Sequence, residues 1–193
     1  MPIPVQHSDA TLSRISSRLL NREDVLQVPH HMLPLIVLSN GPGLISRLIH
    51  WRTKGPSHSM WMHKPGMVAS QSVHFHERFL MDIIEDGATL WFWHCLAWSV
   101  DMRVVLSRYI QMKLDLPWYT TRYDWLGIVG QAINVPGINV PGLSYCSENV
   151  RDGLYLMEGE HVNCGGHPTP AALERWFMAH EDFQLYGTYV PAS

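Results

Sequence analysis

The sequence is poor in cysteine, and its few thiols form no recognisable pattern. Cys95, Cys146 and Cys164 are the three cysteines among 193 residues, and no two of them have a CxxC spacing. Three thiols cannot all pair within one chain. This excludes a fold built on a disulfide framework and favours a reducing compartment.

Basic runs, a secretory signal and long apolar runs are also missing. Lys and Arg number 14 against 17 Asp and Glu, which gives a formal net charge of −3. Because binding to phosphate backbones needs a Lys/Arg-rich footprint, we exclude nucleic acid as the main partner. Residues 1–9 lack the pattern of a secretory signal, and no later run is long enough to span a membrane. We therefore expect a protein without a membrane span that stays in the cytoplasm of the producing cell, or leaves it by lysis or inside a particle.

Apolar and aromatic residues, in contrast, are plentiful. Hydrophobic residues make up 46% of the chain, and it contains eight Trp and seven Tyr. That is enough apolar material for one compact domain with a real core, and the aromatic residues indicate core packing or an aromatic-lined groove. We expect residues 1–30 to form an N-terminal arm or helix and residues 31–193 to form the domain.

Hydrophobic periodicity predicts both helices and strands, and therefore an α+β fold. Strands are expected at 33–38, 59–62, 67–73 and 89–98, with an edge strand in the tail 181–193. Helices are expected at 9–22, 44–52, 101–114, 146–156 and 169–176. The segment 57–75, with its arms at 59–62 and 67–73, is expected to form a hairpin around a Pro-Gly turn. The strand at 89–98 has apolar residues on both faces, which predicts that both faces are covered.

Cys146 stands where a thiolate is most easily formed. It follows the tandem loop Asn134-Val135-Pro136-Gly137-Ile138 and Asn139-Val140-Pro141-Gly142-Leu143, and it begins an expected helix. Unpaired N–H groups and the helix dipole favour S⁻ at a helix N-terminus. A nucleophilic cysteine also needs a base, which His58 would supply by holding the proton and returning it to the leaving amine. The competing interpretation of Cys146 is an inert core residue.

The order of these motifs, histidine first and cysteine later, is the reverse of that in ordinary papain-like enzymes. Three stretches carry a likeness in this order: 43–53 running into Ser57-His58, then 123–130, then Tyr145-Cys146-Ser147-Glu148. With them the chain resembles the circularly permuted papain-like hydrolases related to NlpC-type cell-wall peptidases, including the orthopoxvirus and bacteriophage branches. The resemblance implies a circularly permuted papain-like α+β fold, an antiparallel sheet whose His-strand comes first, and a Cys-helix packed on that sheet.

The resemblance also implies a third catalytic group on the strand paired with the His-strand. Related enzymes place Glu, Gln, Asn or His there, and this chain offers no carboxylate at that point. Gln71 is the choice for orienting the imidazole, with Ser70 and His74 as alternatives. Tyr145 and Tyr123 are candidates for lining the substrate site. A neutral group would stabilise the imidazolium less than Glu would.

Other polar residues are given structural roles. Asp124 is expected to cap a helix or anchor a loop, and Glu148 to hold the Cys-helix. His63 is expected on the surface of the hairpin turn. His74 and His76 would share a strand face and could chelate, but they lack a third ligand at regular spacing, so neither a metal nor another cofactor is expected.

The function implied by the resemblance is a cysteine peptidase or amidase that cleaves an amide bond in peptidoglycan stem peptides. One alternative is a structural or docking component of a phage tail or virion, with other virion or tail proteins as partners and weak or lost activity. A second is a lipid-type acyltransferase or thioesterase, although the chain has no Asn-Cys-Glu-His motif.

Overall fold

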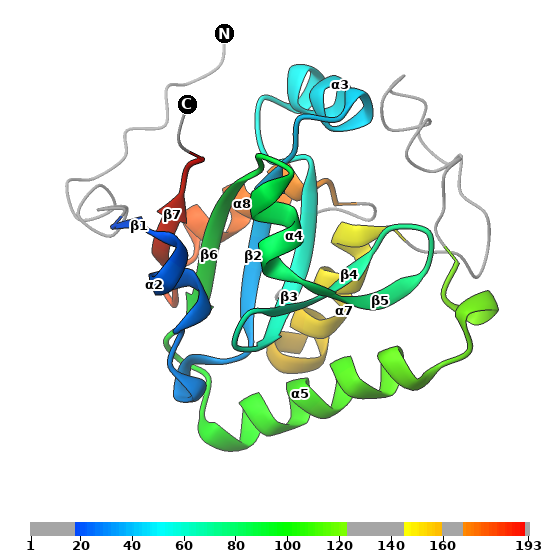
Figure 1. Ribbon diagram of the computed structural model, residues 1–193. Coiled ribbons are helices and arrows are strands. Elements are labelled where there is room, and N and C mark those ends of the chain that lie inside the picture. Colours follow the sequence, from blue (N-terminus) through cyan, green and yellow to red (C-terminus); the bar gives the residue numbers. More distant parts are fainter. Residues whose placement is uncertain (1–17, 123–144, 160–167, 192–193) are drawn as a thin grey trace, which may run out of the picture.

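The fold is built around one mixed β-sheet. A computed structural model describes residues 18–122, 145–159 and 168–191. Seven strands lie in the order β1-β7-β6-β2-β3-β4-β5, with β1 parallel to β7 and every other neighbouring pair antiparallel (Figure 1). The strands are β1 (Leu19–Leu20), β2 (Leu35–Asn40), β3 (His58–Lys64), β4 (Met67–Gln71), β5 (Phe75–Phe79), β6 (Thr89–Cys95) and β7 (Phe183–Tyr189).

Helices cover both faces of this sheet. Among the described residues the α-helices are α2 (Arg22–Leu26), α3 (Leu44–Thr53), α4 (Leu80–Glu85), α5 (Val100–Asp115), α7 (Cys146–Glu158) and α8 (Pro170–Ala179). Short 3₁₀ turns lie at His30–Met32 and Trp118–Thr120. α4 lies on one face and α7 and α8 on the other, while α3 stands apart at one end of the sheet (Figure 1). The architecture is therefore α+β, as the hydrophobic periodicity predicts.

Alternation along the strands divides the core into two layers. On the first face, Trp61 and Leu38 pack with Val150 of α7, Leu106 of α5 and Phe177 of α8. On the second face, side chains from the same strands pack against α2 and α4. The strands contribute Val37, Met60, Met62 and Phe92, and the helices contribute Val25, Leu80 and Ile84. The first layer is the one that fixes the position of α7.

Several local predictions are confirmed. The hairpin β3–β4 turns at Gly66, which has φ +70°. α7 begins at Cys146, as expected. α8 has Thr169 as its N-cap, whose side chain accepts from the N–H of Ala172, and Pro170 at its start. β6 lies between β7 and β2 with both faces packed, also as expected.

Other local predictions were wrong. The expected helix 9–22 does not include Leu19 and Leu20, which form β1. The next helix begins only at Arg22, after a capping box at Asn21. Residues 9–17 lie outside the described residues. The tail strand β7 is not an edge strand, because the two-residue β1 pairs with its outer side. The strand β5 and the helix α4 were not predicted from the hydrophobic periodicity.

His63 also differs from its predicted surface position. Its side chain is only 4% exposed, and its Nε2 lies 2.9 Å from Oε1 of Glu77 on β5. Burial, opposed by the charge of Glu77, lowers the pKa of His63. The same glutamate pairs with Lys64, so three charged or titratable groups tie the far end of the hairpin to β5.

No helix in the described part of the chain has both the length and the apolar character needed to cross a bilayer.

Candidate active site at the start of helix α7

The first turn of α7 is held by its own residues and by the chain before α8. The Glu148 carboxylate accepts from the N–H of Tyr145 at 3.3 Å, which satisfies one of the donors at the helix start. The hydroxyl of Ser147 donates to the carbonyl of Pro168 at 2.5 Å. Cys146 lies between these anchors and is only 3% exposed. Glu148 thus has the structural role expected for it.

α7 packs closely on the sheet through its middle. A Cβ added at Gly153 would lie 2.6 Å from the indole of Trp61, so only glycine permits this approach of the helix to β3. The Trp61 Nε1–H points at the carbonyl of Asn149 at 3.5 Å. One turn closer to Cys146, the Asn149 amide donates to Oε1 of Gln71 on β4 at 3.1 Å. These contacts fix where the helix N-terminus meets β3.

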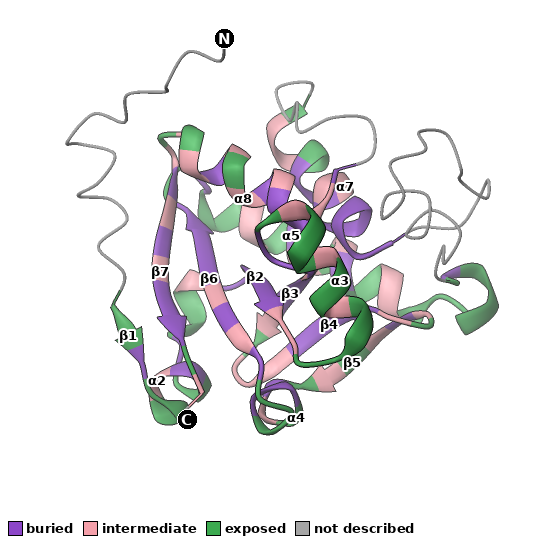
Figure 2. Ribbon diagram, turned by 90° about the horizontal axis from the view of Figure 1, so that it is seen from above, coloured by how far each residue is buried: buried purple, intermediate pink, exposed green. Residues whose placement is uncertain are grey.

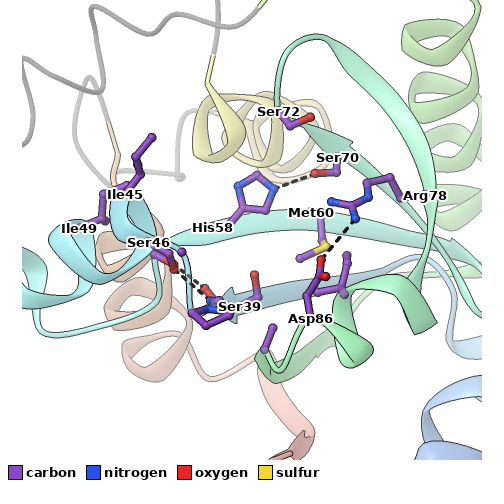
Figure 3. Close-up of a pocket in the computed structure, with 16 residues that line it drawn as sticks. Ser39, Ile45, Ser46, Ile49, His58, Met60, Ser70, Ser72, Arg78 and Asp86 are labelled. Atoms are coloured by element: carbon purple, nitrogen blue, oxygen red, sulfur yellow. Dashed lines mark hydrogen bonds and ion pairs between the residues drawn. The ribbon is translucent and has the colours of Figure 1, made fainter.

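His58 is the first residue of β3 and lies beside that N-terminus. Its Nε2 is 2.7 Å from the hydroxyl of Ser70 on β4 (Figure 3). Its side chain also hydrogen-bonds Cys146, and with Nε2 engaged by Ser70 the ring nitrogen left for the thiol is Nδ1. The backbone of Ser59, the next residue of β3, hydrogen-bonds Cys146 as well. The arrangement is a thiol–imidazole–hydroxyl chain with Ser59 as an additional partner of the sulfur.

The electrostatics of this arrangement favour the thiolate. Burial is the largest influence on Cys146 and by itself raises the pKa. The charge and hydrogen bond of His58, together with the backbone hydrogen bond of Ser59, more than offset it and lower the pKa of Cys146 to about 7. At neutral pH a substantial part of the sulfur is therefore S⁻, the form that attacks carbonyl carbon.

Cys95 shows what burial does without such partners. It lies in the core near the Glu158 carboxylate, and burial raises the pKa of its thiol to about 12. The pKa values of the two described cysteines, neither of which forms a disulfide, thus depart in opposite directions from that of an ordinary thiol. Cys164 lies outside the described residues.

A cleft of about 490 Å³ opens beside His58. Ser70 and Ser72 of the β4 strand and the turn after it line one side, and Ile45 and Ile49 of α3 line another. Arg78 of β5 projects into the cleft and faces Asp86 at 3.8 Å, a loose ion pair (Figure 3). The remaining lining is largely apolar, and it includes Met60, Ile83 and Ala88.

The predicted site residues are only partly brought together. His58 and Cys146 meet, although they are far apart in sequence. Gln71, the first choice for orienting the ring, is buried and engaged elsewhere, since its amide donates to the carbonyl of Thr121 at 2.6 Å and its oxygen accepts from Asn149. Ser70, the alternative one residue earlier, contacts His58 instead. The reason is strand alternation, because neighbouring residues of β4 face opposite sides of the sheet.

The remaining candidates lie away from the ring. Tyr145 is 1% exposed, packs against Ile49 and is not among the residues that line the cleft. His74 stacks at 5.0 Å on His76, and the carbonyl of His74 contacts the ring of His76. Tyr123 and Asp124 lie outside the described residues. Within the part of the chain that the structure describes, no three His, Cys, Asp or Glu side chains gather in a way that could hold a metal ion.

Three residues of the site were not found by sequence reasoning. Ser59 follows the histidine directly, and alternation along β3 turns it toward α7. Asn149 lies one helical turn after Cys146 and connects α7 to Gln71. Arg78 belongs to a strand that the sequence did not reveal. Only Ser59 could have been inferred from spacing, as the residue next to the histidine on the opposite face.

Comparison with known proteins assigns no family to this geometry. No protein-family model matches the chain, and a search of curated proteins found no match. The function must therefore be inferred from the residues around Cys146.

Proposed function

We propose that this protein is a cysteine hydrolase that cleaves an amide bond through a Cys146–His58 dyad, in a circularly permuted papain-like fold. The observation that carries the proposal is a thiol at a helix N-terminus whose imidazole partner is held on its other nitrogen by Ser70. A structural cysteine needs none of these features, as Cys95 demonstrates. The order of elements, with the His-strand before the Cys-helix, agrees with the permuted arrangement.

The chemistry follows from these positions. The Cys146 thiolate adds to the carbonyl carbon, and the oxyanion is stabilised by the positive end of the helix dipole at the N-terminus of α7. The C–N bond then breaks as the His58 imidazolium gives its proton to the leaving amine. Water, deprotonated by His58, attacks the resulting thioester and releases a carboxylic acid together with the thiol.

Ser70 acts in this scheme as a positioning residue. Its hydroxyl oxygen accepts from the Nε2–H of the ring, which leaves Nδ1 directed to the sulfur. A hydroxyl carries no charge, so it orients the imidazolium without the Coulombic stabilisation that a carboxylate would add. Gln71 contributes indirectly, because it joins β4 to α7 through Asn149.

The proposed substrate is a peptidoglycan stem peptide. Arg78 is the described cation that projects into the cleft, and its loose pairing with Asp86 leaves the guanidinium able to bind a carboxylate. Stem peptides present free carboxylates next to their amide bonds. Small apolar side chains of such a peptide fit the wall formed by Ile45 and Ile49.

The test is digestion of purified peptidoglycan with product analysis by mass spectrometry. The wild-type protein is expected to release fragments with one new amine and one new carboxylate at a single type of amide bond. Cys146→Ser should abolish the release, whereas Cys95→Ala, a matched loss of the other described thiol, should leave it unchanged. Equal release by Cys146→Ser, or no release by the wild type, would overturn the proposal.

A second candidate function is hydrolysis or transfer of an acyl chain held as an ester or thioester. The apolar lining of the cleft favours it, since Ile45, Ile49, Met60 and Ile83 could contact an alkyl chain. The same dyad would serve, with an alcohol or thiol as leaving group. Turnover of a series of p-nitrophenyl esters separates the two candidates, because an acyl site gains rate with each added methylene and a peptide site does not.

A further inference from the structure

Helix α3 carries an apolar stripe that faces solvent. Leu44 is 82% exposed, Leu48 49% and Trp51 66%, and their i, i+4, i+7 spacing places them on one side of the helix. No residue of α3 is buried; its inner side packs Ile49 against Tyr145, and Ser46 hydrogen-bonds Ser57. Figure 2 shows most of the helix in the exposed colour. Amphipathic helices of globular proteins normally turn such a stripe to the core, so this one indicates an interaction surface.

The Arg and Lys residues of α3 and of the position after it face no Asp or Glu on the helix itself. Arg47 and Arg52 flank it on opposite sides, at about 100° per residue, and Lys54 follows the helix with its Nζ 6.0 Å from the Trp51 ring. The segment 25–76 contains no Asp or Glu. Long basic side chains can lay their stems along apolar groups while the charged ends reach outward. An apolar stripe between cations is complementary to lipid tails lying beneath anionic headgroups.

The location of α3 connects this surface to the cleft. The helix stands at one end of the sheet, beyond the ends of β2 and β3 (Figure 1). Its inner side supplies Ile45 and Ile49 to the cleft that contains His58 (Figure 3). A surface bound by the outer side of α3 therefore lies next to the mouth of the cleft.

We propose that α3 docks the protein on an anionic lipid surface, with the helix lying in the headgroup plane. Ten residues give a helix of about 15 Å, half of a bilayer core, so the helix lies on the membrane and does not cross it. Leu44, Leu48 and Trp51 enter the boundary between headgroups and acyl chains, and Arg47, Arg52 and Lys54 contact lipid phosphates. The docking does not depend on the hydrolase chemistry.

The test is flotation of the full chain with vesicles of phosphatidylcholine, alone or mixed with phosphatidylglycerol. Binding is expected to the mixed vesicles, and it should weaken with salt. Leu44→Ser with Leu48→Ser should weaken it by about tenfold or more. The matched control is Val100→Ser with Val104→Ser on α5, which removes side chains that are 77% and 43% exposed and should leave binding unchanged. Cys146→Ser should bind as the wild type does, which separates docking from catalysis.

Two further measurements keep the proposal testable if the leucine variant folds poorly. Arg47→Gln with Arg52→Gln should weaken binding and flatten its salt dependence, whereas Arg22→Gln with Arg108→Gln, with the same change in charge, should not. Brominated lipid should quench the wild-type tryptophan fluorescence more than that of Trp51→Phe. No binding by the wild type, equal binding to neutral vesicles, or equal effects of the two arginine pairs would overturn the proposal, as would a protein ligand that saturates α3 in place of lipid.

Discussion

Substitution of Gly153 by alanine tests whether close packing of α7 on Trp61 sets the site. The new Cβ would lie 2.6 Å from Cζ2 and 3.3 Å from Cε2 of the indole, and 3.2 Å from Cδ1 of Leu106. Carbon atoms in contact prefer about 3.5 to 4.0 Å, so helix or indole must move by about 1 Å. Trp61 is 0% exposed on a central strand and has little room to yield.

Two effects of opposite sign decide the outcome. Alanine in a helix interior is about 1 kcal/mol more favourable than glycine. Overpacking a rigid core costs about 1 to 3 kcal/mol, and a contact this short against an aromatic ring belongs at the upper end. We expect Gly153→Ala to lower the free energy of unfolding by about 1 to 2 kcal/mol, a fall in Tm of roughly 2 to 8 °C for a chain of this size. The shift of α7 should also slow alkylation of Cys146.

The assays are urea unfolding and thermal melting. The control is Gly41→Ala, since a Cβ at Gly41 meets only the Ser46 hydroxyl, at an ordinary 3.8 Å; this variant should not be destabilised. Trp61→Phe removes the clashing atoms, so the double variant should be less destabilised than the sum of the singles by about 1 kcal/mol. A Gly153→Ala protein as stable as the wild type, or more stable, would refute the packing argument.

The remaining predictions concern the ring, the cleft and buried histidine. Ser70→Ala should lower the hydrolysis rate about tenfold and raise the pH midpoint of Cys146 alkylation. Ser70→Thr should restore both, and the control Ser107→Ala should change neither. An unchanged midpoint in Ser70→Ala would show that Ser70 does not position the ring. Arg78→Gln should raise KM for an anionic peptide more than it lowers kcat, and Arg108→Gln should change neither; equal KM values would show that Arg78 does not bind substrate. Burial lowers the pKa of His94, and its Nε2 is 3.2 Å from Oε1 of Gln184. The unfolded state then binds more protons, so the neutral form stabilises the fold fully above about pH 6.5, and this stability is lost as the pH falls through the lower folded pKa. Urea unfolding between pH 7 and 5 should show this loss, and His94→Gln should show a shallower dependence; parallel curves for the two proteins would contradict it.

Sequence patterns were most informative where local chemistry decides the structure. The N-cap at Thr169 followed by Pro170, the Pro-Gly turn ending at Gly66, and the start of α7 at Cys146 are set by neighbours along the chain. The burial of both faces of β6 could be predicted because apolar residues alternate onto both faces of the strand. The pairing of strands that lie far apart in the sequence was harder to predict. β1 consists of two residues whose strand conformation depends on β7, more than 160 positions later.

The candidate site was likewise predictable only in part. Cys146 could be selected from its place at the head of an expected helix, and His58 through the resemblance of its surroundings to a His-strand; in the structure α7 begins at Cys146 and β3 at His58. The choice between Ser70 and Gln71 required the register of β4, since a shift of one residue exchanges the two faces of a strand. Met60 pairs with Ser70, and this register places Ser70 beside the ring and Gln71 toward α7. Nothing in the local sequence around 70 and 71 fixes that register.

The most direct test of the central claim is the rate of iodoacetamide labelling of Cys146 against pH, read by intact mass, in the wild type and in His58→Ala. Cys95 is an internal reference, since burial raises the pKa of its thiol to about 12 and it should label slowly throughout. The wild-type midpoint should lie near 7. In His58→Ala the midpoint should rise above the roughly 8.5 of a free thiol. Burial raises the pKa of Cys146, and the charge and hydrogen bond of His58, which chiefly lower it, are then absent. A wild-type midpoint at or above that of a free thiol, unmoved by the loss of His58, would contradict the proposed dyad.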